Sequence, residues 1–406
     1  MPDPDYTIRD KVCVIGIGET EYTKHGAIGR PEFRLALEAI LAACADAGLD
    51  PRRLDGFASY SNDRNDANRV ATALNVPQVG FANMVWGGGG GGMGAAIGNA
   101  AAAIVAGYAD YVVVYRALAQ GEFGRFGQSR ASGQGSGRLR GFFAFNIPVG
   151  LMTPAQWLGM QMQRHMHEYG TTSRQLGHVA VACYKHAQHN PRAVMNGRPI
   201  TIDDHQNSRV IADPYRLYDC CQETDGAAAL ILTRADRARD FPHTPVYLAA
   251  AAQGGGNRQG QGIGGYFKPD FTTSNFPTLA RRLYRQAGLG PEEIDVAQVY
   301  ENFTGQVITS LEDHGFCKVG EGGPFVEGGR IEHPTVAEPD APFAGQLPIN
   351  TAGGNLAEAY THGINLALEG VRQMRGGSTL QVPDARTCLV VAGPATAPVS
   401  NCIFHN

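Results

Sequence analysis

A segment near the start of the chain recurs 240 positions later. Residues 47–55 read AGLDPRRLD and residues 287–295 read AGLGPEEID, so five of nine positions are identical and a sixth pairs leucine with isoleucine. Each copy follows a stretch with apolar residues at helical spacing and precedes a short apolar stretch typical of a strand. The repeat therefore predicts an α/β protein with two similar halves, each a sheet with helices on its faces.

The chain continues in the same order after each copy. In the first half, six consecutive glycines at residues 87–92 precede a helix of small residues and a strand at residues 110–114. In the second half, Gly353 and Gly354 precede a helix and a strand at residues 387–391. This common order indicates that both halves are built from βαβ units.

The repeat also divides the chain. We expect an N-terminal half over residues 1–240 and a C-terminal half over residues 241–406. An inserted region at about residues 117–215 interrupts the first half, with helices predicted over residues 153–169 and 172–188. Such a long insertion is typical of a segment that covers the mouth of an active site.

Charge and composition exclude several classes of function. The 34 basic and 38 acidic residues leave a net charge of −4, which does not favour binding to nucleic acid or to a membrane surface through bulk charge. The N-terminus lacks the basic and apolar regions of a signal peptide, and residues 94–107 are too few to span a bilayer. We expect a soluble cytoplasmic protein without a nucleic-acid or membrane partner.

Cysteine and histidine spacing predicts no metal site. The eight cysteines form no C-x-x-C pair, and a reduced, mostly buried set is expected. His165 and His167 would lie on different faces of a helix, and Cys220 and Cys221 have no second ligand pair nearby.

The glycine run at residues 87–92 is the densest part of a glycine-rich chain, in which 53 of 406 residues are glycine. It is not a phosphate-binding loop, because Met93 and Gly94 follow where that loop needs lysine and a hydroxyl residue. The run is either a flexible loop, a place of close packing between helices, or the floor of a site that a ligand approaches closely.

Four motifs together resemble the thiolase superfamily, and its sterol-carrier-protein or lipid-transfer-protein branch most closely. They read IADPYRLYDCC at residues 211–221, TDGAAAL at 224–230, VYENF at 299–303 and NTAGG at 350–354. The resemblance covers nearly the whole chain. It implies a duplicated five-layer αβαβα fold with two pseudo-symmetric halves and an inserted loop domain.

The reactive positions of the family differ in this chain. The nucleophilic cysteine of a thiolase corresponds to Gly90, and the first residue of the family's N-E-A-F or H-E-A-F motif to Tyr300. The histidine of the G-H-P motif corresponds to Tyr360, and the last cysteine, in C-x-G, to Val391. Because an acyl-enzyme needs a nucleophile, these replacements argue against Claisen condensation.

The remaining groups suit an aldolase, as in the steroid side-chain aldolases that the chain resembles. Backbone N–H groups near Gly90, Gly91 and Gly393 match the family's oxyanion hole and would bind a thioester oxygen as it becomes an enolate. Tyr300 and Tyr360 would serve jointly as acid and base, with pKa values lowered by a neighbouring donor or partial positive charge. The expected lyase converts a β-hydroxyacyl-CoA, a 17-hydroxy steroid side-chain acyl-CoA, into a 17-keto steroid and propionyl-CoA.

Three neighbouring residues are expected to support this pair. His362 would point away from the site if a helix has begun there, Glu301 would anchor its loop, and Asn350 would stand behind the tyrosines. No tightly bound cofactor is expected, because coenzyme A enters as part of the substrate. Candidates for binding its phosphates lie in the inserted region, namely Arg125, Arg130, Arg138 and Arg140.

The resemblance also implies partners. We expect a homodimer that pairs through residues 110–114 as an edge strand, and a complex with an acyl-CoA-binding protein built from an OB-fold and a zinc ribbon. Two alternatives stay open: residual acyl-CoA thiolase or acyltransferase activity on another nucleophile such as Cys317, and a non-catalytic binding or scaffold subunit.

Overall fold

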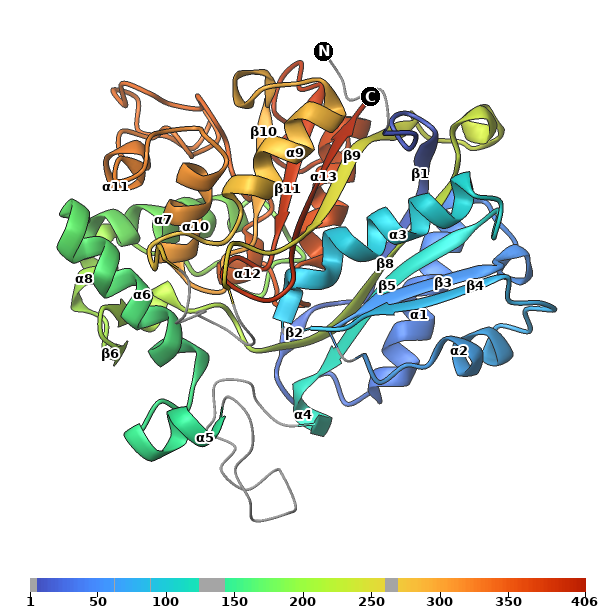
Figure 1. Cartoon of the computed structure of the whole chain (residues 1–406), viewed down its shortest axis with the longest axis horizontal. Coiled ribbons are helices and arrows are strands. Elements are labelled where there is room, and N and C mark those ends of the chain that lie inside the picture. Colours follow the sequence, from blue (N-terminus) through green and yellow to red (C-terminus); the bar gives the residue numbers. More distant parts are fainter. Residues whose placement is uncertain (1–5, 62, 88, 124–142, 260–268) are drawn as a thin grey trace.

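The computed structural model describes residues 6–61, 63–87, 89–123, 143–259 and 269–406, and it shows an α/β protein with one large sheet (Figure 1). From edge to edge its strands are β10 (Val296–Val299), β11 (Thr387–Ala392), β12 (Val399–His405), β9 (Val246–Gly254), β1 (Val12–Glu19), β8 (Thr224–Arg234), β5 (Val112–Ala119), β3 (Gly56–Tyr60) and β4 (Phe81–Val85). The short β2 (Thr23–Lys24) pairs with β8 outside this path.

Two equivalent sets of strands meet at β1 and β9. These two strands pair antiparallel through the register Cys13 to Tyr247 and Val14 to Val246. On one side β1, β8 and β5 alternate in direction and β3 runs parallel to β5; on the other side β9, β12, β11 and β10 repeat this pattern. A parallel bridge from Ala297 to Ile349 stands where β4 stands in the first half. The predicted duplication is thus present in the sheet.

Helices form three layers around the two sets of strands. α1 (Glu32–Ala47) packs against β1, β8 and β5, and α9 (Pro277–Ala287) packs against β9 and β12. α3 (Met93–Val105) and α13 (Ile364–Arg375) each contact strands of both halves (Figure 1). These contacts give five layers in the order helix, first set of strands, helices α3 and α13, second set of strands, helix.

The repeated sequence builds the same local structure twice. Gly48 ends α1 and Gly288 ends α9, both in the left-handed backbone region, with φ of 65° and 71°. Glycine adopts this conformation without steric cost, and it is the common residue directly after a helix. Pro51 and Pro291 then each begin one turn of 3-10 helix.

The aspartate that ends each copy connects two strands. The carboxylate of Asp55 accepts hydrogen bonds from the backbone N–H groups of residues 110–111, just before β5. Asp295 accepts from the N–H groups of residues 386–387, at the start of β11. The identical residue therefore satisfies the first donors of the neighbouring strand in both halves.

The prediction that residues 110–114 form an edge strand is wrong. β5, which begins at Val112, pairs with β8 on one side and with β3 on the other. The outer strand of this half is β4, whose side chains alternate between intermediate and exposed along Phe81–Met84. A mixed sequence such as FANMV gives a weak strand signal, whereas VVV is apolar because it lies inside the sheet.

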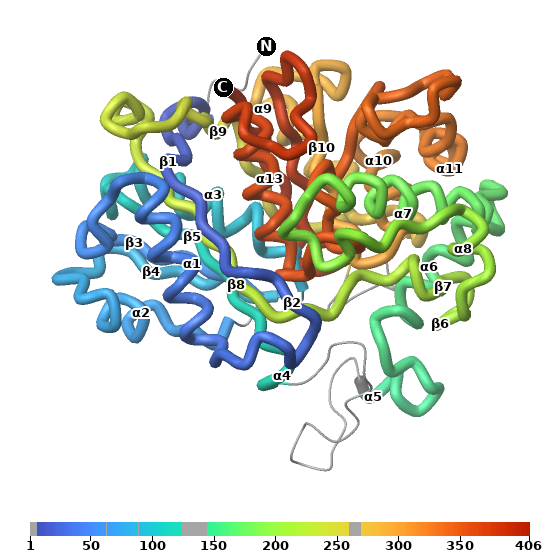
Figure 2. The backbone as a smooth tube through the Cα atoms, turned by 180° about the vertical axis from the view of Figure 1, so that it is seen from behind, coloured from blue at the N-terminus to red at the C-terminus, as the bar shows by residue number. Residues whose placement is uncertain are grey.

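The inserted region packs on the second half of the molecule. Its helices are α5 (Phe143–Asn146), α6 (Pro154–Tyr169), α7 (Ser173–Ala187) and α8 (Ile202–Asn207), followed by the hairpin of β6 (Val210–Ala212) and β7 (Tyr215–Arg216). α7 contacts α10 (Thr304–Asp313), α11 (Gly322–Phe325) and α12 (Gly354–Ala357), and both views place it beside α10 and α11 (Figures 1 and 2). The insertion therefore brings its residues to the loops that carry the second half of the site.

Two further short α-helices are α2 (Ala67–Ala73) and α4 (Gln120–Phe123). The predicted boundary near residue 240 falls in the connection from β8 to β9. Among the described residues, no helix combines the length and the hydropathy that crossing a bilayer requires.

Candidate active site

A cavity of about 950 Å³ opens where the inserted region meets both halves. Its walls include Gly89, Arg116, Cys221, Tyr300, Tyr360 and His362. A cavity of this size lies at the upper end of the range for sites that enclose small molecules. Both tyrosines predicted as catalytic lie on its wall.

The two tyrosines contact each other directly. Tyr300 follows β10, where its backbone N–H donates to Val391 at 3.0 Å, and Tyr360 follows α12. The Tyr360 backbone is held at both ends by Thr224, whose hydroxyl accepts from the Tyr360 N–H at 2.9 Å and donates to its carbonyl at 3.0 Å. The Tyr300 hydroxyl donates to the Tyr360 hydroxyl at 2.8 Å. Strand and loop thus place two phenols in one hydrogen-bonded pair.

Gly90 touches this pair. Its backbone N–H donates to the Tyr300 hydroxyl oxygen at 3.2 Å. A Cβ on residue 90 would lie 2.1 Å from Cε2 of Tyr300 and 2.7 Å from the carbonyl oxygen of His362. No side chain fits there, because the Tyr300 ring fills the space that a nucleophile at position 90 would need.

Gly91 and Gly393 pack against each other below the pair. A Cβ on Gly393, whose φ is 61°, would lie 2.2 Å from the backbone N of Gly91. A Cβ on Gly91 would lie 2.0 Å from the carbonyl oxygen of Pro398. Close backbone packing therefore explains this part of the glycine run, while Gly87 and Gly89 line the cavity.

Burial raises the pKa of both tyrosines. For Tyr300 the loss of hydration outweighs the hydrogen bond from the Gly90 N–H, which acts in the opposite direction. For Tyr360 it outweighs the hydrogen bond from Tyr300 and the charge of Arg116. The predicted lowering of these pKa values is wrong, since both phenols lie in the central apolar core. Both tyrosines are neutral at pH 7.

His362 lines the cavity, because the helix that was expected to turn it away has not yet begun at this residue. α13 begins only at Ile364, and His362 has a left-handed backbone with φ of 53°. Its ring stands 5.3 Å from the ring of Tyr360, centroid to centroid, at 87°. Burial, together with the charge of Arg116, holds the pKa of its imidazole well below the usual value.

Glu301 and Asn350 lie behind the cavity wall. The Asn350 side chain accepts from the Val299 N–H at 2.7 Å and donates to the Val299 carbonyl at 2.9 Å, so it holds the end of β10. Glu301 is fully buried and accepts from the Leu356 N–H at 3.3 Å, and burial raises its pKa to about 8. We propose that both residues position the tyrosine pair without touching substrate.

Sequence reasoning missed Arg116 and Asp63. Arg116 lies on β5, its side chain is 2% exposed, and its guanidinium pairs with the Asp63 carboxylate at 2.5 Å. The signal was present, because an arginine interrupts the apolar strand VVVYRALA. A charged residue in such a strand is rarely buried unless it is paired.

The cysteines offer no activated nucleophile. All eight are free and five are buried, as predicted. Cys221 lines the cavity, but burial raises the pKa of its thiol well above the usual value. Burial raises the pKa of Cys317 to about 12, and Cys317 does not line the cavity. Since the thiolate is the nucleophilic form, neither is poised for acyl transfer.

Basic side chains stand along the cavity. Those on its wall besides Arg116 are Lys24, His25, Arg64 and Arg209. The four arginines predicted to bind phosphates lie outside the described residues. Within the described part of the chain, no group of three or more histidine, cysteine, aspartate or glutamate side chains is arranged to hold a metal ion.

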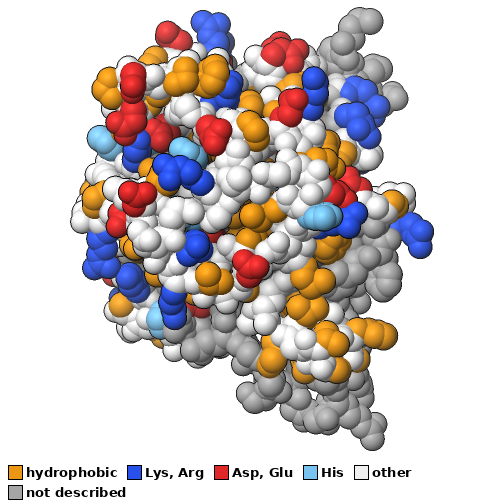
Figure 3. All heavy atoms as spheres, turned by 90° about the vertical axis from the view of Figure 1, so that its left-hand side faces the viewer, with side chains coloured by type: hydrophobic (Ala, Val, Ile, Leu, Met, Phe, Trp, Pro, Cys, Tyr) orange, Lys and Arg blue, Asp and Glu red, His pale blue; other side chains and the backbone are white. Residues whose placement is uncertain are grey.

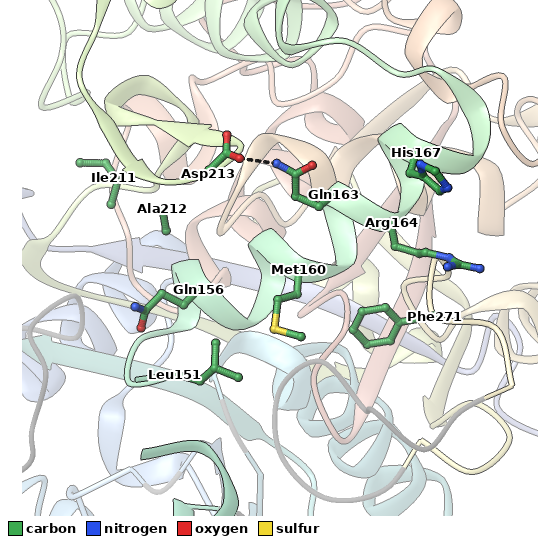
Figure 4. Close-up of a pocket in the computed structure, with 10 residues that line it drawn as sticks. All are labelled: Leu151, Gln156, Met160, Gln163, Arg164, His167, Ile211, Ala212, Asp213 and Phe271. Atoms are coloured by element: carbon green, nitrogen blue, oxygen red, sulfur yellow. Dashed lines mark hydrogen bonds between the residues drawn. The ribbon is translucent and has the colours of Figure 1, made fainter. Parts of the chain in front are cut away.

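A surface groove of about 690 Å³ adjoins the cavity along α6 (Figure 4). It shares Gln156 and Ile211 with the cavity, and Gln163 donates to Asp213 across it at 2.6 Å. The neighbouring surface carries exposed apolar side chains, such as Val149 at 72% and Val210 at 54%, and Figure 3 shows hydrophobic and charged groups mixed on this side.

The duplicated sheet with two shared central helices, and a site where the loops before those helices meet, define a thiolase-fold protein with glycine at residue 90 and, among the described residues of the cavity wall, no activated thiol. A family model described as "Thiolase C-terminal domain-like" matches residues 266–402. The "Steroid side-chain-cleaving aldolase" of Thermomonospora curvata is 42% identical over 394 residues, covering 97% of both chains.

Two further comparisons agree. The "17-hydroxy-3-oxo-4-pregnene-20-carboxyl-CoA lyase" of Mycobacterium tuberculosis is 42% identical and covers 97% of this chain and 99% of its own. The solved "Ltp2-ChsH2(DUF35) aldolase" superposes with a TM-score of 0.87 at 40% identity, covering 98% of each chain. The chain belongs to the thiolase superfamily, in the branch of the steroid side-chain-cleaving aldolases. The resemblance seen in the sequence is thereby confirmed, and so is the duplicated fold.

Proposed function

We propose that the protein is a lyase that cleaves a carbon–carbon bond in a β-hydroxyacyl-CoA thioester by a retro-aldol reaction. The substrate is a 17-hydroxy steroid side-chain acyl-CoA, and the products are a 17-keto steroid and propionyl-CoA. The names of the two 42% identical relatives support the reaction class. The single observation that carries the proposal is the Tyr300–Tyr360 pair, hydrogen bonded at 2.8 Å beside a glycine in place of a nucleophile.

The reaction moves one proton and breaks one bond. The β-hydroxyl loses its proton to the tyrosine pair while its oxygen forms the ketone. The electrons of the Cα–Cβ bond pass into the thioester as an enolate. As the pair accepts the hydroxyl proton it gives one of its own phenolic protons to Cα, so that neither phenol becomes a cation and propionyl-CoA is complete. Because the pair takes one proton and returns one, it can start and finish neutral, in agreement with the raised pKa values of both phenols.

The direction of the hydrogen bond distinguishes the two tyrosines. Tyr300 donates to Tyr360, and this bond lowers the pKa of Tyr360 while it raises the pKa of Tyr300. Tyr360 is therefore better able to carry transient negative charge. We assign to Tyr360 the exchange of its own proton, which passes to Cα, for the proton of the substrate hydroxyl. Tyr300, which is held by the Gly90 N–H, donates the hydrogen bond that stabilises the negative charge developing on Tyr360 as its proton leaves.

Binding of coenzyme A needs positive charge at the mouth of the cavity. Lys24, His25, Arg64 and Arg209 stand on its wall, and they replace the arginines of the inserted loop as our candidates for the phosphates. Arg64 is partly neutralised by Glu32 at 2.5 Å. The acyl-CoA is a substrate, and we propose no tightly bound cofactor.

We also propose the assembly. A homodimer would pair through β4, the outer strand of its half, beside the exposed Met84 and Trp86. A second protein with an OB-fold and a zinc ribbon would join it, since the related solved aldolase contains a DUF35 subunit. We place this complex in the cytoplasm.

The test is to incubate the chain together with its partner and a 17-hydroxy steroid acyl-CoA, and to follow both products by mass spectrometry. Release of a ketone and propionyl-CoA in equal amounts is expected. Full activity of both Tyr300→Phe and Tyr360→Phe would overturn the site assignment. Binding without turnover would favour a scaffold subunit, and an acyl adduct on a cysteine would favour thiolase or acyltransferase chemistry.

A further inference from the structure

The Gly90 N–H, one of the three expected oxyanion donors, already donates to Tyr300, and the other two residues, Gly91 and Gly393, pack against each other and do not line the cavity. The retro-aldol step places negative charge on the thioester oxygen, and this charge needs a donor of its own in a site that excludes water. Another donor on the cavity wall is therefore required. His362 stands there, within ring contact of Tyr360.

Arg116 determines which nitrogen of His362 carries the proton. Nε and Nη2 of the guanidinium lie 3.3 Å and 3.2 Å from Nδ1 of His362. A guanidinium has five N–H donors and no acceptor, so Nδ1 must present its lone pair. The imidazole is then neutral, with its proton on Nε2.

Asp63 holds Arg116 in this position. Its carboxylate pairs with Nη1, its side chain is fully buried, and it also accepts from the Asn65 N–H at 2.7 Å. Nη2 of Arg116 further donates to the Ser61 carbonyl at 3.3 Å. The ion pair is thus buried, and the guanidinium uses its remaining donors on one histidine nitrogen.

The backbone of His362 is fixed as well. Tyr60 on β3 donates its hydroxyl proton to the His362 carbonyl at 3.0 Å. Gly363 follows with φ of 85°, and a Cβ there would lie 2.6 Å from the Tyr300 ring. Residues of both halves therefore hold His362, at its backbone and at Nδ1 of its ring.

We propose that His362, held by Arg116 and Asp63 with its proton on Nε2, donates the hydrogen bond that binds the thioester oxygen as it becomes an enolate. This rests on the proposed function, and it names the donor of that reaction. Arg116 and Asp63 are positioning residues, because they act through the histidine. Among the described residues, the charged and titratable groups around the imidazole include Arg116 and Arg64 from the first half and Tyr360 from the second, with Asp63 paired to Arg116.

Amide isosteres of histidine provide a sharp test. His362→Gln places an N–H donor near the position of Nε2, whereas His362→Asn places its amide near Nδ1. With the steroid acyl-CoA and the partner present, His362→Leu should lower kcat by about 10²-fold to 10³-fold with little change in KM. The kcat of His362→Gln should be at least about tenfold higher than that of His362→Leu, whereas the kcat of His362→Asn should stay close to that of His362→Leu.

His165→Gln is the matched control, because His165 is also fully buried but bonds Glu312 and Thr171 away from the cavity. Its kcat should equal that of the unmodified protein. A folded His362→Leu with unchanged kcat would overturn the proposal, and so would a folded Gln variant no more active than the Asn variant. If Leu fails to fold, the Gln and Asn pair decides.

The positioning role of Arg116 and Asp63 is tested by measuring kcat as a function of pH. Arg116→Met combined with Asp63→Asn removes the ion pair without leaving a charge unpaired. The kcat of this variant should fall below pH about 6.5, where an ordinary imidazole protonates, whereas the unmodified protein should show no such limb. Identical profiles would overturn the role of Arg116. Absence of turnover by the unmodified complex would instead refute the proposed function itself.

Discussion

The loop before α3 and the loop before α13 occupy equivalent places in the two halves, yet they serve the site in opposite ways. The first is built from glycines that pack too closely for any side chain at residue 90. The second carries Tyr360 and His362, both of which line the cavity. Of these two loops, one thus supplies bare backbone and the other supplies side chains, while β5 of the first half adds Arg116.

The scaffold beneath these loops has stayed the same in both halves. Gly48 and Gly288 end their helices in the same left-handed conformation, and Asp55 and Asp295 bind equivalent backbone donors. Besides the inserted region, the two halves therefore differ most where these loops meet the cavity. Variants in the loops and variants in the scaffold should consequently affect different properties of the protein.

The largest effect is expected from the side chains of the second half. Tyr300→Phe and Tyr360→Phe should each lower kcat by about 10²-fold to 10⁴-fold, because each removes one member of a proton relay. The kcat of the double variant should lie within about threefold of the kcat of the less active single variant, because the effects of groups that act as a unit do not multiply. Steady-state kinetics of the three variants checks this. Independent, multiplying losses would mean that the tyrosines act separately.

A side chain on the bare loop should have the next largest effect. Gly90→Ala places a Cβ where the Tyr300 ring lies at 2.1 Å, so the ring must shift and the pair must separate. We expect kcat to fall by about 10²-fold and the free energy of unfolding to fall by about 1–3 kcal/mol.

Gly377→Ala is the matched control for Gly90→Ala, because a Cβ at Gly377 meets nothing within 4 Å. Its kcat and its stability in urea should match those of the unmodified protein. Full activity of Gly90→Ala would show that the contact between the glycine loop and Tyr300 does not matter for catalysis.

A pH effect is expected from Glu301. Burial raises its pKa from 4.5 to about 8 in the folded chain. Between these values the unfolded chain has lost this proton and the folded chain keeps it, so stability falls as pH rises from about 5 to 8. One such carboxyl changes the unfolding free energy by at most about 1.4 kcal/mol per pH unit.

Glu301→Gln should flatten the dependence of the unfolding free energy on pH in this window, measured by urea unfolding at several pH values. Part of the slope should remain, because burial also raises the pKa of Glu358 to about 8. An unchanged slope in Glu301→Gln would show that Glu301 ionises normally in the folded chain.

The smallest effect on activity is expected from variants of Asp55 and Asp295, which lie in the scaffold that both halves share. Asp55→Ala and Asp295→Ala should each lower stability by about 1 kcal/mol per net hydrogen bond lost, with kcat unchanged. Because the two sites lie in different halves, their losses should add in the double variant. Thermal unfolding and kinetics measure both properties. A loss of kcat in either variant would show that the scaffold and the cavity loops are not separable.

The sequence was informative where a pattern is local. The repeat of nine residues predicted the duplicated sheet, and motif positions predicted that Tyr300 and Tyr360 share a site. It was not informative where partners lie far apart, as for Arg116 and His362, which are 246 positions apart. The edge strand was misjudged because β4 lacks an apolar run, and the pKa direction was misjudged because burial cannot be read from a motif.

The contact between Gly90 and the Tyr300 ring also bears on how such a site can arise by mutation. A cysteine at position 90 and a tyrosine at position 300 exclude each other sterically, so the two replacements cannot be acquired in either order with equal ease. In this chain a thiol at position 90 would fit only if the Tyr300 ring moved. The single substitution Gly90→Cys is consequently not expected to give condensing activity, because the Tyr300 ring occupies the space that the thiol needs.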